Sequence, residues 1–262
     1  MNGTSPRYLK AIPLILVLLT AFACSSPPSG KDNVSRQADQ GNAEAQYVLG
    51  GMYYEGKNVP QDYAEAIKWY RKAADQGHAG AQNSLGFMYA DGKGVPQDYA
   101  EAIKWYRKAA DQGHAGAQYN LGITYANGKG VPLDYAEAIK WTRMAADRRN
   151  ADAQYVLGVQ YQKGRVVPQD YAEAAKWYGR AADQGHAGAQ FALGFMYVVG
   201  RGVPQDHVQS YFWYSLAASR SAGEDYKKYS EKSDQVALKL PPDHLMKAQQ
   251  MTREWEAKHP RK

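Results

Sequence analysis

The sequence predicts an all-α protein: an α/α solenoid of five 36-residue helix-turn-helix repeats with a C-terminal helical cap. Tryptophans recur every 36 residues, at Trp69, Trp105, Trp141, Trp177 and Trp213. Prolines keep the same step, at Pro60, Pro96, Pro132, Pro168 and Pro204, and Val59–Gln82 is identical to Val95–Gln118. A pair of short helices cannot bury its apolar faces alone, whereas stacked pairs share one continuous core. We place the five repeats at residues 41–220.

The N-terminal segment has the pattern of a secretory signal. Arg7 and Lys10 precede an apolar stretch from Ala11 to Ala23. That stretch is shorter than the roughly 20 residues that a membrane-spanning helix needs. A basic start, a short apolar run and then small residues are typical of a cleaved export signal. Residues 1–23 are therefore predicted to be a signal peptide.

Cys24, the single cysteine of the chain, leaves two cleavage possibilities. Ala21–Ala23 fits the small-x-small rule of general signal peptidase, and Ala23-Cys24 also resembles a bacterial lipobox. A lone thiol has no disulfide partner in an oxidising compartment, whereas a lipidated cysteine needs none. We therefore expect a lipid anchor at Cys24 and a tether over residues 24–40, with plain secretion as the alternative. In the lipoproteins that it resembles, Ser25 after the cysteine implies the outer membrane.

The first helix of a repeat is predicted at about Ala43–Glu55. Gln46, Leu49, Gly50 and Tyr53 share one helical face. A glycine inside a helix costs about 1 kcal/mol relative to alanine. Because Gly50 recurs in every repeat, we expect a second helix to approach closely there. Gly56 then ends the helix, since it can adopt positive φ.

The second helix is predicted to begin at Asp62. Asp62 and Glu65 have the spacing of a capping box, in which Asp accepts from the first N–H groups and Glu reaches back. The buried stripe is expected to contain Tyr63, Ala66, Ile67, Tyr70, Ala73 and Ala74, with Trp69 at its border. Gly77 ends this helix.

Together these residues resemble the Sel-one-like repeat (SLR) family, whose members are relatives of the tetratricopeptide repeat. The resemblance rests on the pattern Ala45-Gln46-x-x-Leu49-Gly50-x-x-Tyr53-x-x-Gly56-x-x-Val59-Pro60-x-Asp62-Tyr63-x-x-Ala66-x-x-Trp69-x-x-x-Ala73-Ala74-x-x-Gly77. It implies a solenoid and a role in assembling complexes. The fourth repeat departs at Arg165-Val166, Asn150 replaces a histidine, and His207 replaces a tyrosine; these changes concern loops and surfaces.

Residues 221–262 are expected to form a helical cap. Gly223 to Lys239 is polar, and Leu240-Pro241-Pro242-Asp243 interrupts it. In the helix that follows, Leu245, Ala248, Thr252 and Trp255 are expected to face inward. An atypical, polar end closes the open core of a solenoid.

No candidate catalytic or metal site stands out. The pairs Asp62/Glu65, Asp98/Glu101, Asp134/Glu137 and Asp170/Glu173 are explained by helix capping. His78, His114 and His186 occupy equivalent loops, so a stack of repeats would hold them apart, whereas metal ligands must converge. We expect no catalytic residues, no metal, no cofactor and no small-molecule substrate. The charges alternate in sign along the chain, which gives no support for nucleic-acid binding.

The residues that vary between repeats are the better guide to function. In tetratricopeptide-like solenoids, the corresponding positions of the first helix line a concave groove. Tyr and Phe are enriched at interaction hot spots. For the Gly51/Phe87 column, packing between repeats is an equal alternative to binding. The expected partner-binding residues are Tyr47, Tyr54, Asn83, Phe87, Tyr119, Ile123, Tyr155, Val159, Phe191 and Phe195.

The sequence thus predicts a non-enzymatic scaffold or adaptor in a bacterial cell envelope. It would be exported to the periplasm, anchored to the outer membrane through Cys24, and would hold a peptide or protein segment in the groove. Two alternatives stay open. One is an enzyme acting on cell-wall material or β-lactams, and the other is a structural spacer without a specific ligand.

Overall fold

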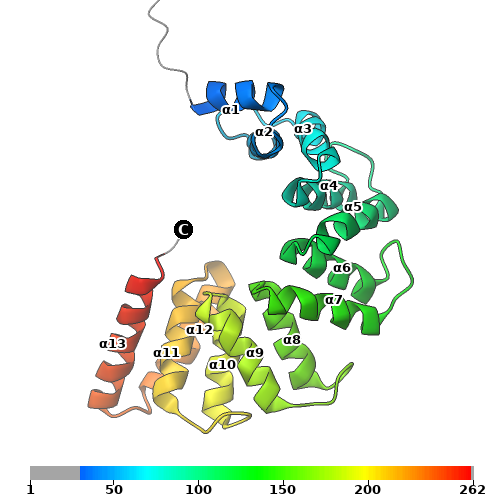
Figure 1. Ribbon diagram of the computed structural model, residues 1–262. Helices are drawn as coiled ribbons and strands as arrows, with labels where there is room; N and C mark the ends of the chain where they lie inside the picture. The colour runs from blue at the N-terminus through cyan, green and yellow to red at the C-terminus, as the bar shows by residue number, and fades with distance from the viewer. Residues whose placement is uncertain (1–29, 261–262) are drawn as a thin grey trace, which may run out of the picture.

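The computed structural model describes residues 30–260, which form thirteen α-helices and no strand (Figure 1). The predicted all-α solenoid is confirmed. The helices are α1 (Gly30–Asp39), α2 (Ala43–Glu55), α3 (Tyr63–Asp75), α4 (Ala79–Asp91), α5 (Tyr99–Asp111), α6 (Ala115–Asn127), α7 (Tyr135–Asp147), α8 (Ala151–Lys163), α9 (Tyr171–Asp183), α10 (Ala187–Val199), α11 (His207–Ser219), α12 (Gly223–Ala237) and α13 (Pro242–Lys258).

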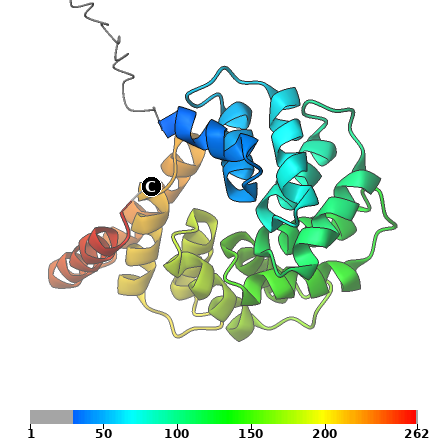
Figure 2. The same ribbon diagram turned by 45° about the horizontal axis from the view of Figure 1, so that its top comes forward.

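Five antiparallel helix pairs form the repeats. We call α2, α4, α6, α8 and α10 the A helices and α3, α5, α7, α9 and α11 the B helices, so that α2–α3 is the first repeat and α10–α11 the fifth. Each B helix packs against its own A helix and, in the first four repeats, against the next A helix. This stacking produces a curved array (Figure 1), which follows most of a ring when the molecule is turned (Figure 2).

The ends of the helices are set by capping residues. Each A helix ends at a glycine in the left-handed conformation, as Gly56 does at φ 71°. Asp62 caps α3 by accepting the N–H groups of Ala64 and Glu65 at 2.9 and 3.0 Å. The reciprocal half of the predicted capping box is wrong: the N–H of Asp62 donates to the carbonyl of Tyr53 instead. Glu65 is therefore free to pair with Lys68, at 2.5 Å.

The tryptophan of a B helix joins neighbouring repeats. Trp105 of α5 is buried together with Ala73 of α3 and Leu85 of α4. Trp177 of α9 likewise packs with residues of α7 and α8. The 36-residue recurrence of tryptophan is thus explained, because each ring covers both helices of a seam between repeats and removes a large apolar area from water.

A buried glutamine in each A helix bonds to the preceding B helix. Nε2 of Gln82 donates to the carbonyl of Ala74 at 3.1 Å, and the bond recurs at the other seams. Gln46 makes the same bond to Ala38 of α1, at 3.0 Å. Helix α1 therefore occupies the place of a B helix and covers the first repeat. The described part of the segment expected as a tether, from residue 30 onward, is helical and packed; Cys24 and residues 1–29 lie outside the described residues.

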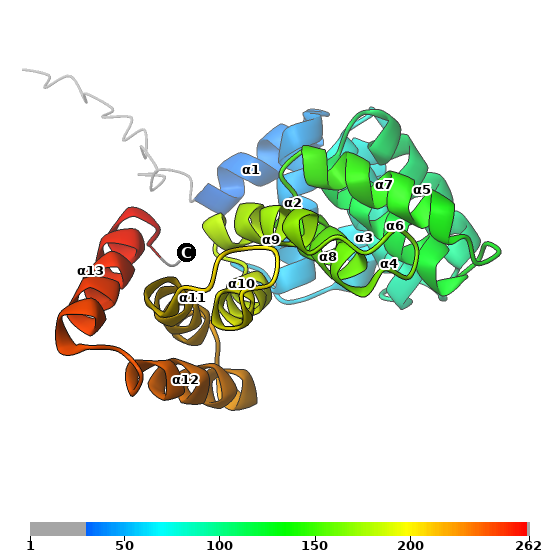
Figure 3. The ribbon, with the colours of Figure 1, turned by 90° about the horizontal axis from the view of Figure 1, so that it is seen from below.

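The C-terminal helices cover the other end of the array. Both α12 and α13 pack on α11 (Figure 3). Ala248 is buried, and Leu245, Thr252 and Trp255 are half-buried, as the sequence predicts. No helix within residues 30–260 is long and apolar enough to span a bilayer.

Candidate binding surface on the A helices

The A helices lie on the inner side of the curved array. Figure 1 shows α4 and α6 closer to the centre of the arc than α5 and α7. Side chains on the exposed face of the A helices therefore line a concave surface. All ten predicted binding residues belong to these helices, as the sequence requires. The structure separates them into packed and exposed groups, and their role in binding stays a prediction.

The residues at the position of Tyr47 in successive A helices form the Tyr47 column, and its aromatic rings are half-buried between repeats. Tyr47 stacks on His78, with ring centroids 4.6 Å apart, and lies 5.8 Å from the ring of Tyr70. Tyr155 makes the equivalent contacts three repeats further on. Phe191 stacks on Tyr229 of α12 at 4.4 Å. These rings, with half-buried Tyr119, join neighbouring helices as well as contributing to the inner surface.

The Phe87 column carries the most exposed rings of the predicted set. Phe87 is 37% exposed and Phe195 is 41% exposed, whereas Ile123 and Val159 are half-buried. Val199, one turn beyond Phe195, is 40% exposed. Large apolar side chains that remain in contact with water at the inner face have apolar surface that a bound partner could bury.

Two neighbouring hollows lie along the inner face. The first, of about 150 Å³, is lined by Tyr54, Tyr70, Asn83, Ser84, Phe87, Met88 and Asn120, which come from three successive A helices and from α3. The second, of about 280 Å³, is lined by Ala90, Asp91, Gln97, Tyr99, Ala102, Tyr106, Asn120, Ile123, Thr124 and Lys129. Asn120 belongs to both, so the hollows adjoin.

Asn83 and Asn120 form a polar pair at this place. Nδ2 of Asn120 donates to Oδ1 of Asn83 at 3.0 Å, across α4 and α6. Other repeats have Tyr47, Tyr155 or Val156 at the equivalent positions. Asn83 was in the predicted set, but Asn120 was missed. The signal was available in the sequence, because Asn120 is the single amide in its column of repeats.

Lys93 contacts two of the residues that line the first hollow, Tyr54 and Phe87. Its Nζ donates to the hydroxyl of Tyr54 at 2.9 Å and lies 5.0 Å from the ring centroid of Phe87. The hydrogen bond to Tyr54 raises the pKa of Lys93, which keeps the amine charged. Asp91 lies 3.5 Å from the same Nζ. Burial raises the pKa of Tyr70 to about 12, so its hydroxyl is protonated at neutral pH.

The loop histidines are helix caps. Nδ1 of His78, of His114 and of His186 accepts the N–H of the residue three positions later, at 3.0, 3.1 and 3.0 Å. Oδ1 of Asn42 and of Asn150 does the same at 2.8 Å. The exchange with asparagine, a preferred N-cap residue, was the overlooked signal of this role. Within residues 30–260, no group of three or more His, Cys, Asp or Glu is placed to hold a metal ion.

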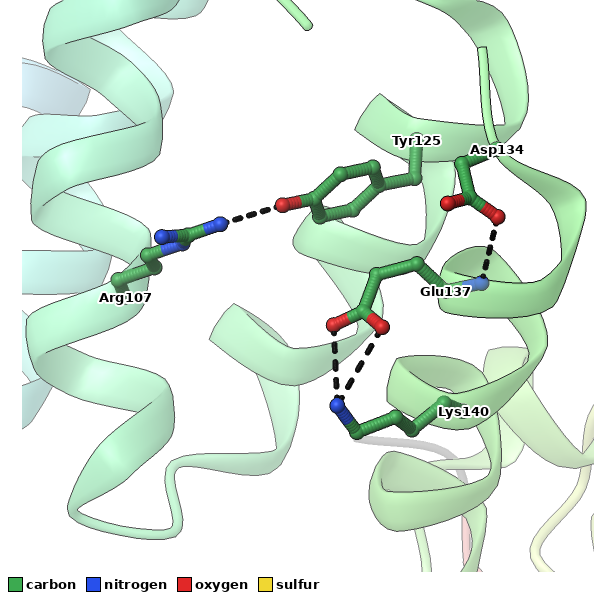
Figure 4. Close-up of polar contacts among 5 residues, drawn as sticks. All are labelled: Arg107, Tyr125, Asp134, Glu137 and Lys140. Atoms are coloured by element: carbon green, nitrogen blue, oxygen red, sulfur yellow. Dashed lines mark hydrogen bonds and ion pairs between the residues drawn. The ribbon is translucent and has the colours of Figure 1, made fainter. Parts of the chain in front are cut away.

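The repeated carboxylates are engaged in helix structure. Figure 4 shows this in the third repeat, where Asp134 accepts the N–H of Glu137 at 2.9 Å. Glu137 pairs in turn with Lys140 at 3.2 Å. Arg107 of α5 donates to the hydroxyl of Tyr125 on α6, which ties the second and third repeats together. These groups hold helices and seams in place.

The fold and this surface define a tandem-repeat α/α solenoid with an inner face of varied residues. The Sel1 repeat model matches residues 43–78, 79–114, 115–150, 151–186 and 187–221, so the chain belongs to the Sel1 repeat family. Proteins of this family are generally non-catalytic protein-interaction scaffolds. No curated protein sequence matches the chain.

Solved structures agree with this assignment. A protective antigen of uropathogenic Escherichia coli that displays an SLR fold is 37% identical, with a TM-score of 0.70, over 86% of this chain and 48% of that chain. A Sel1 repeat protein from Oxalobacter formigenes is also 37% identical, with a TM-score of 0.71, over 76% and 57%. The chain thus spans about half of these two proteins. An immunity protein from Pseudomonas aeruginosa, 21% identical with a TM-score of 0.52 over 82% of each chain, shares the fold.

Proposed function

We propose that this protein is an adaptor of the bacterial cell envelope that holds a peptide or protein segment against the inner face of its A helices. The observation that carries the proposal is the exposure of Phe87 and Phe195 on that face. Buried aromatic anchors supply much of the affinity at protein interfaces. The repeated carboxylates serve as caps and ion pairs, so the geometry favours binding over catalysis.

An in-cell cross-linking pull-down tests the proposal. The variant Phe87→Ala/Phe195→Ala removes both exposed rings and leaves the half-buried Tyr119 and Tyr155 in place. A double variant of two exposed side chains in the C-terminal cap, Tyr226→Ala/Leu238→Ala, is the matched control. We expect partners to be lost with the first variant and kept with the second. Equal capture by wild type and the first variant would exclude the inner face as the binding surface.

The envelope location rests on the signal-like residues 1–23 and on Cys24. We propose that the chain is exported and lipidated at Cys24. Radiolabelled palmitate should label the full-length protein, and Cys24→Ser should abolish the label and move the protein from the membrane fraction to the soluble periplasm. An unlabelled wild-type protein in the soluble periplasm would instead indicate plain secretion.

A further inference from the structure

The two hollows beside Asn120 bring together unlike side chains from successive repeats. Tyr54, Phe87 and Met88 form the apolar wall of the first hollow. The second contains Asp91 and Lys129, with Nζ of Lys129 lying 5.4 Å from the ring centroid of Tyr99. An apolar hollow and a charged hollow, side by side, fit a ligand with two different groups.

The asparagine pair between the hollows has unused hydrogen-bonding capacity. Oδ1 of Asn83 accepts from Asn120, which leaves the amide N–H groups of Asn83 and the Oδ1 of Asn120 without a partner among the described residues. The free donor and the free acceptor belong to two amide groups that the 3.0 Å hydrogen bond holds together. They match the carbonyl and N–H that one residue of an extended peptide presents on the same side. This arrangement favours a peptide backbone over a purely apolar ligand.

The charges around the hollows favour a carboxylate on the ligand. Lys93 and Lys129 each contribute one positive charge and Asp91 one negative charge, a local balance of +1. Asp91 is within ion-pair distance of Lys93, whereas no carboxylate of residues 30–260 is within that distance of Lys129. Lys129 is exposed, so its amine is open to an incoming anionic side chain.

We propose that these hollows form one subsite for an extended peptide segment that places an apolar side chain against Phe87 and an acidic side chain at Lys129. This subsite rests on the proposed binding function and specifies its ligand. Neighbouring helices lie about 8–10 Å apart. An extended chain advances about 3.3 Å per residue, and its side chains point alternately to opposite faces, so a separation of two positions turns both side chains toward the protein.

Fluorescence anisotropy with synthetic peptides tests the subsite. The probe is a labelled serine-glycine peptide with one phenylalanine and one glutamate two positions apart, made in both orders. In the matched peptides, glutamine or lysine replaces the glutamate. In one of the two orders, wild type should bind the glutamate peptide about threefold to fivefold more tightly than its glutamine counterpart. This ratio corresponds to the free energy of an exposed ion pair. Lys129→Glu should reverse the preference, so that the lysine peptide binds best.

The apolar half of the subsite is tested with Phe87→Ala. This change should weaken the probe about tenfold, as removal of a buried aromatic anchor does. Tyr226→Ala, which removes an exposed ring of α12 outside the A helices, should leave binding unchanged. Circular dichroism shows whether each variant is folded.

Absence of saturable binding, equal binding of the glutamate and glutamine peptides, or an equal loss with Tyr226→Ala would overturn the subsite. The proposed function would stand after such a result if Phe87→Ala/Phe195→Ala still lost its partners in cells. If that pull-down also showed no loss, both proposals would fall.

Discussion

In the second repeat the ring of Tyr106 lies against Gly86 of the A helix, whereas the third repeat has Thr142 in this place. A Cβ atom on Gly86 would lie 2.5 Å from Cδ1 of Tyr106. On Gly122 it would lie 2.5 Å from Oγ1 of Thr142 and 3.1 Å from the backbone oxygen of Ala138. An aromatic ring therefore separates the helices in one repeat, and backbone approaches backbone in the next. The helix pair tolerates loss of the ring by closing the gap.

The turns after the two B helices also differ. Gln112 donates to Oε1 of Gln82 at 2.7 Å. In the third repeat Arg148 replaces this glutamine and donates to the carbonyl of Gly113, at 3.0 Å. Oε1 of Gln118, the counterpart of the acceptor in Gln82, is buried without a partner among the described residues. Leaving a buried acceptor unsatisfied costs free energy.

Two further substitutions weaken the third repeat. Arg149 adopts φ 63° where Gly113 adopts 85°, and a side chain is strained in that conformation. Gln97 donates to the carbonyl of Ala90 at 2.7 Å, whereas its counterpart Leu133 is 54% exposed and cannot make the bond. We infer that stability is unevenly distributed and that the third repeat opens first, since each repeat depends on its own contacts and its neighbours.

The largest expected effect on stability comes from replacing Tyr106 of the second repeat with threonine, the residue that the third repeat has at position 142. Tyr106→Thr should lower the free energy of unfolding by about 3–5 kcal/mol, because it leaves a cavity beside Gly86. Urea denaturation measures the change. Tyr106→Phe, which keeps the ring, should cost much less. A loss below about 1 kcal/mol for Tyr106→Thr would show that α4 and α5 close the gap as α6 and α7 do.

Giving the third repeat the turn residue of the second repeat should stabilise it. Arg148→Gln is expected to supply the missing donor to Gln118 and to raise the free energy of unfolding by about 1 kcal/mol. Arg148→Ala removes the arginine without supplying a donor and is the matched control. Denaturation that does not distinguish the two variants would contradict the assignment of Gln118 as a deficient acceptor.

A smaller gain is expected from removing the strained residue. Arg149→Gly should raise the free energy of unfolding by about 0.5–1 kcal/mol, because relief of left-handed strain is partly offset by the greater freedom of glycine in the unfolded chain. Arg149→Ala should bring no gain, since alanine retains the strain. Thermal melts of the two variants distinguish conformational strain from an effect of charge.

The smallest expected effect on stability concerns His114 and His186, the residues that cap α6 and α10. Burial lowers the pKa of His114 and of His186 from the ordinary value of 6.5. The unfolded chain therefore takes up protons first as the pH falls, and stability decreases through and below pH 6.5. Protonation of Nδ1 also removes the acceptor for the capping N–H.

Asparagine, the natural residue at the equivalent position 150, is the matched replacement. His114→Asn/His186→Asn should flatten the decrease in stability between neutral pH and pH 5, by about 1 kcal/mol or less in total. Urea midpoints measured across that range provide the check. An unchanged slope would mean that other groups cause the acid sensitivity.

The fold was predictable from the sequence because its determinants are local and repeated. Gly50, Gly56 and Asp62 each indicated one feature of a helix pair, and the structure contains all three. The reach of Glu65 was predicted wrongly, because the competing bond from Asp62 to Tyr53 depends on the path of the loop. The register of the repeats could be read directly, since a constant 36-residue period allows one alignment.

The binding surface was only partly accessible from the sequence. The pattern predicted which columns of the A helices line the inner face, but it could not separate packed rings such as Tyr155 from exposed ones such as Phe87. That distinction depends on long-range neighbours, here His186 for Tyr155. Asn120 could have been recognised as the single amide in its column, but its hydrogen bond to Asn83 depends on how two repeats pack together.

The identity of Val59–Gln82 with Val95–Gln118 has a consequence for the length of the molecule. Removal of 36 consecutive residues that begin anywhere within Val59–Gln82 always gives the same shortened sequence. The residues on the two sides of the junction then follow one another as they do in the present chain. The shortened chain would keep α1 at one end and α12 and α13 at the other, and each packed pair of an A helix and a B helix would consist of sequences that already pack together in the present protein. Because such an array is held together by contacts between nearest neighbours, the number of repeats is free to vary while the ends stay fixed. The span of the inner face can thus change in whole-repeat steps while the packing of A helices on B helices is kept.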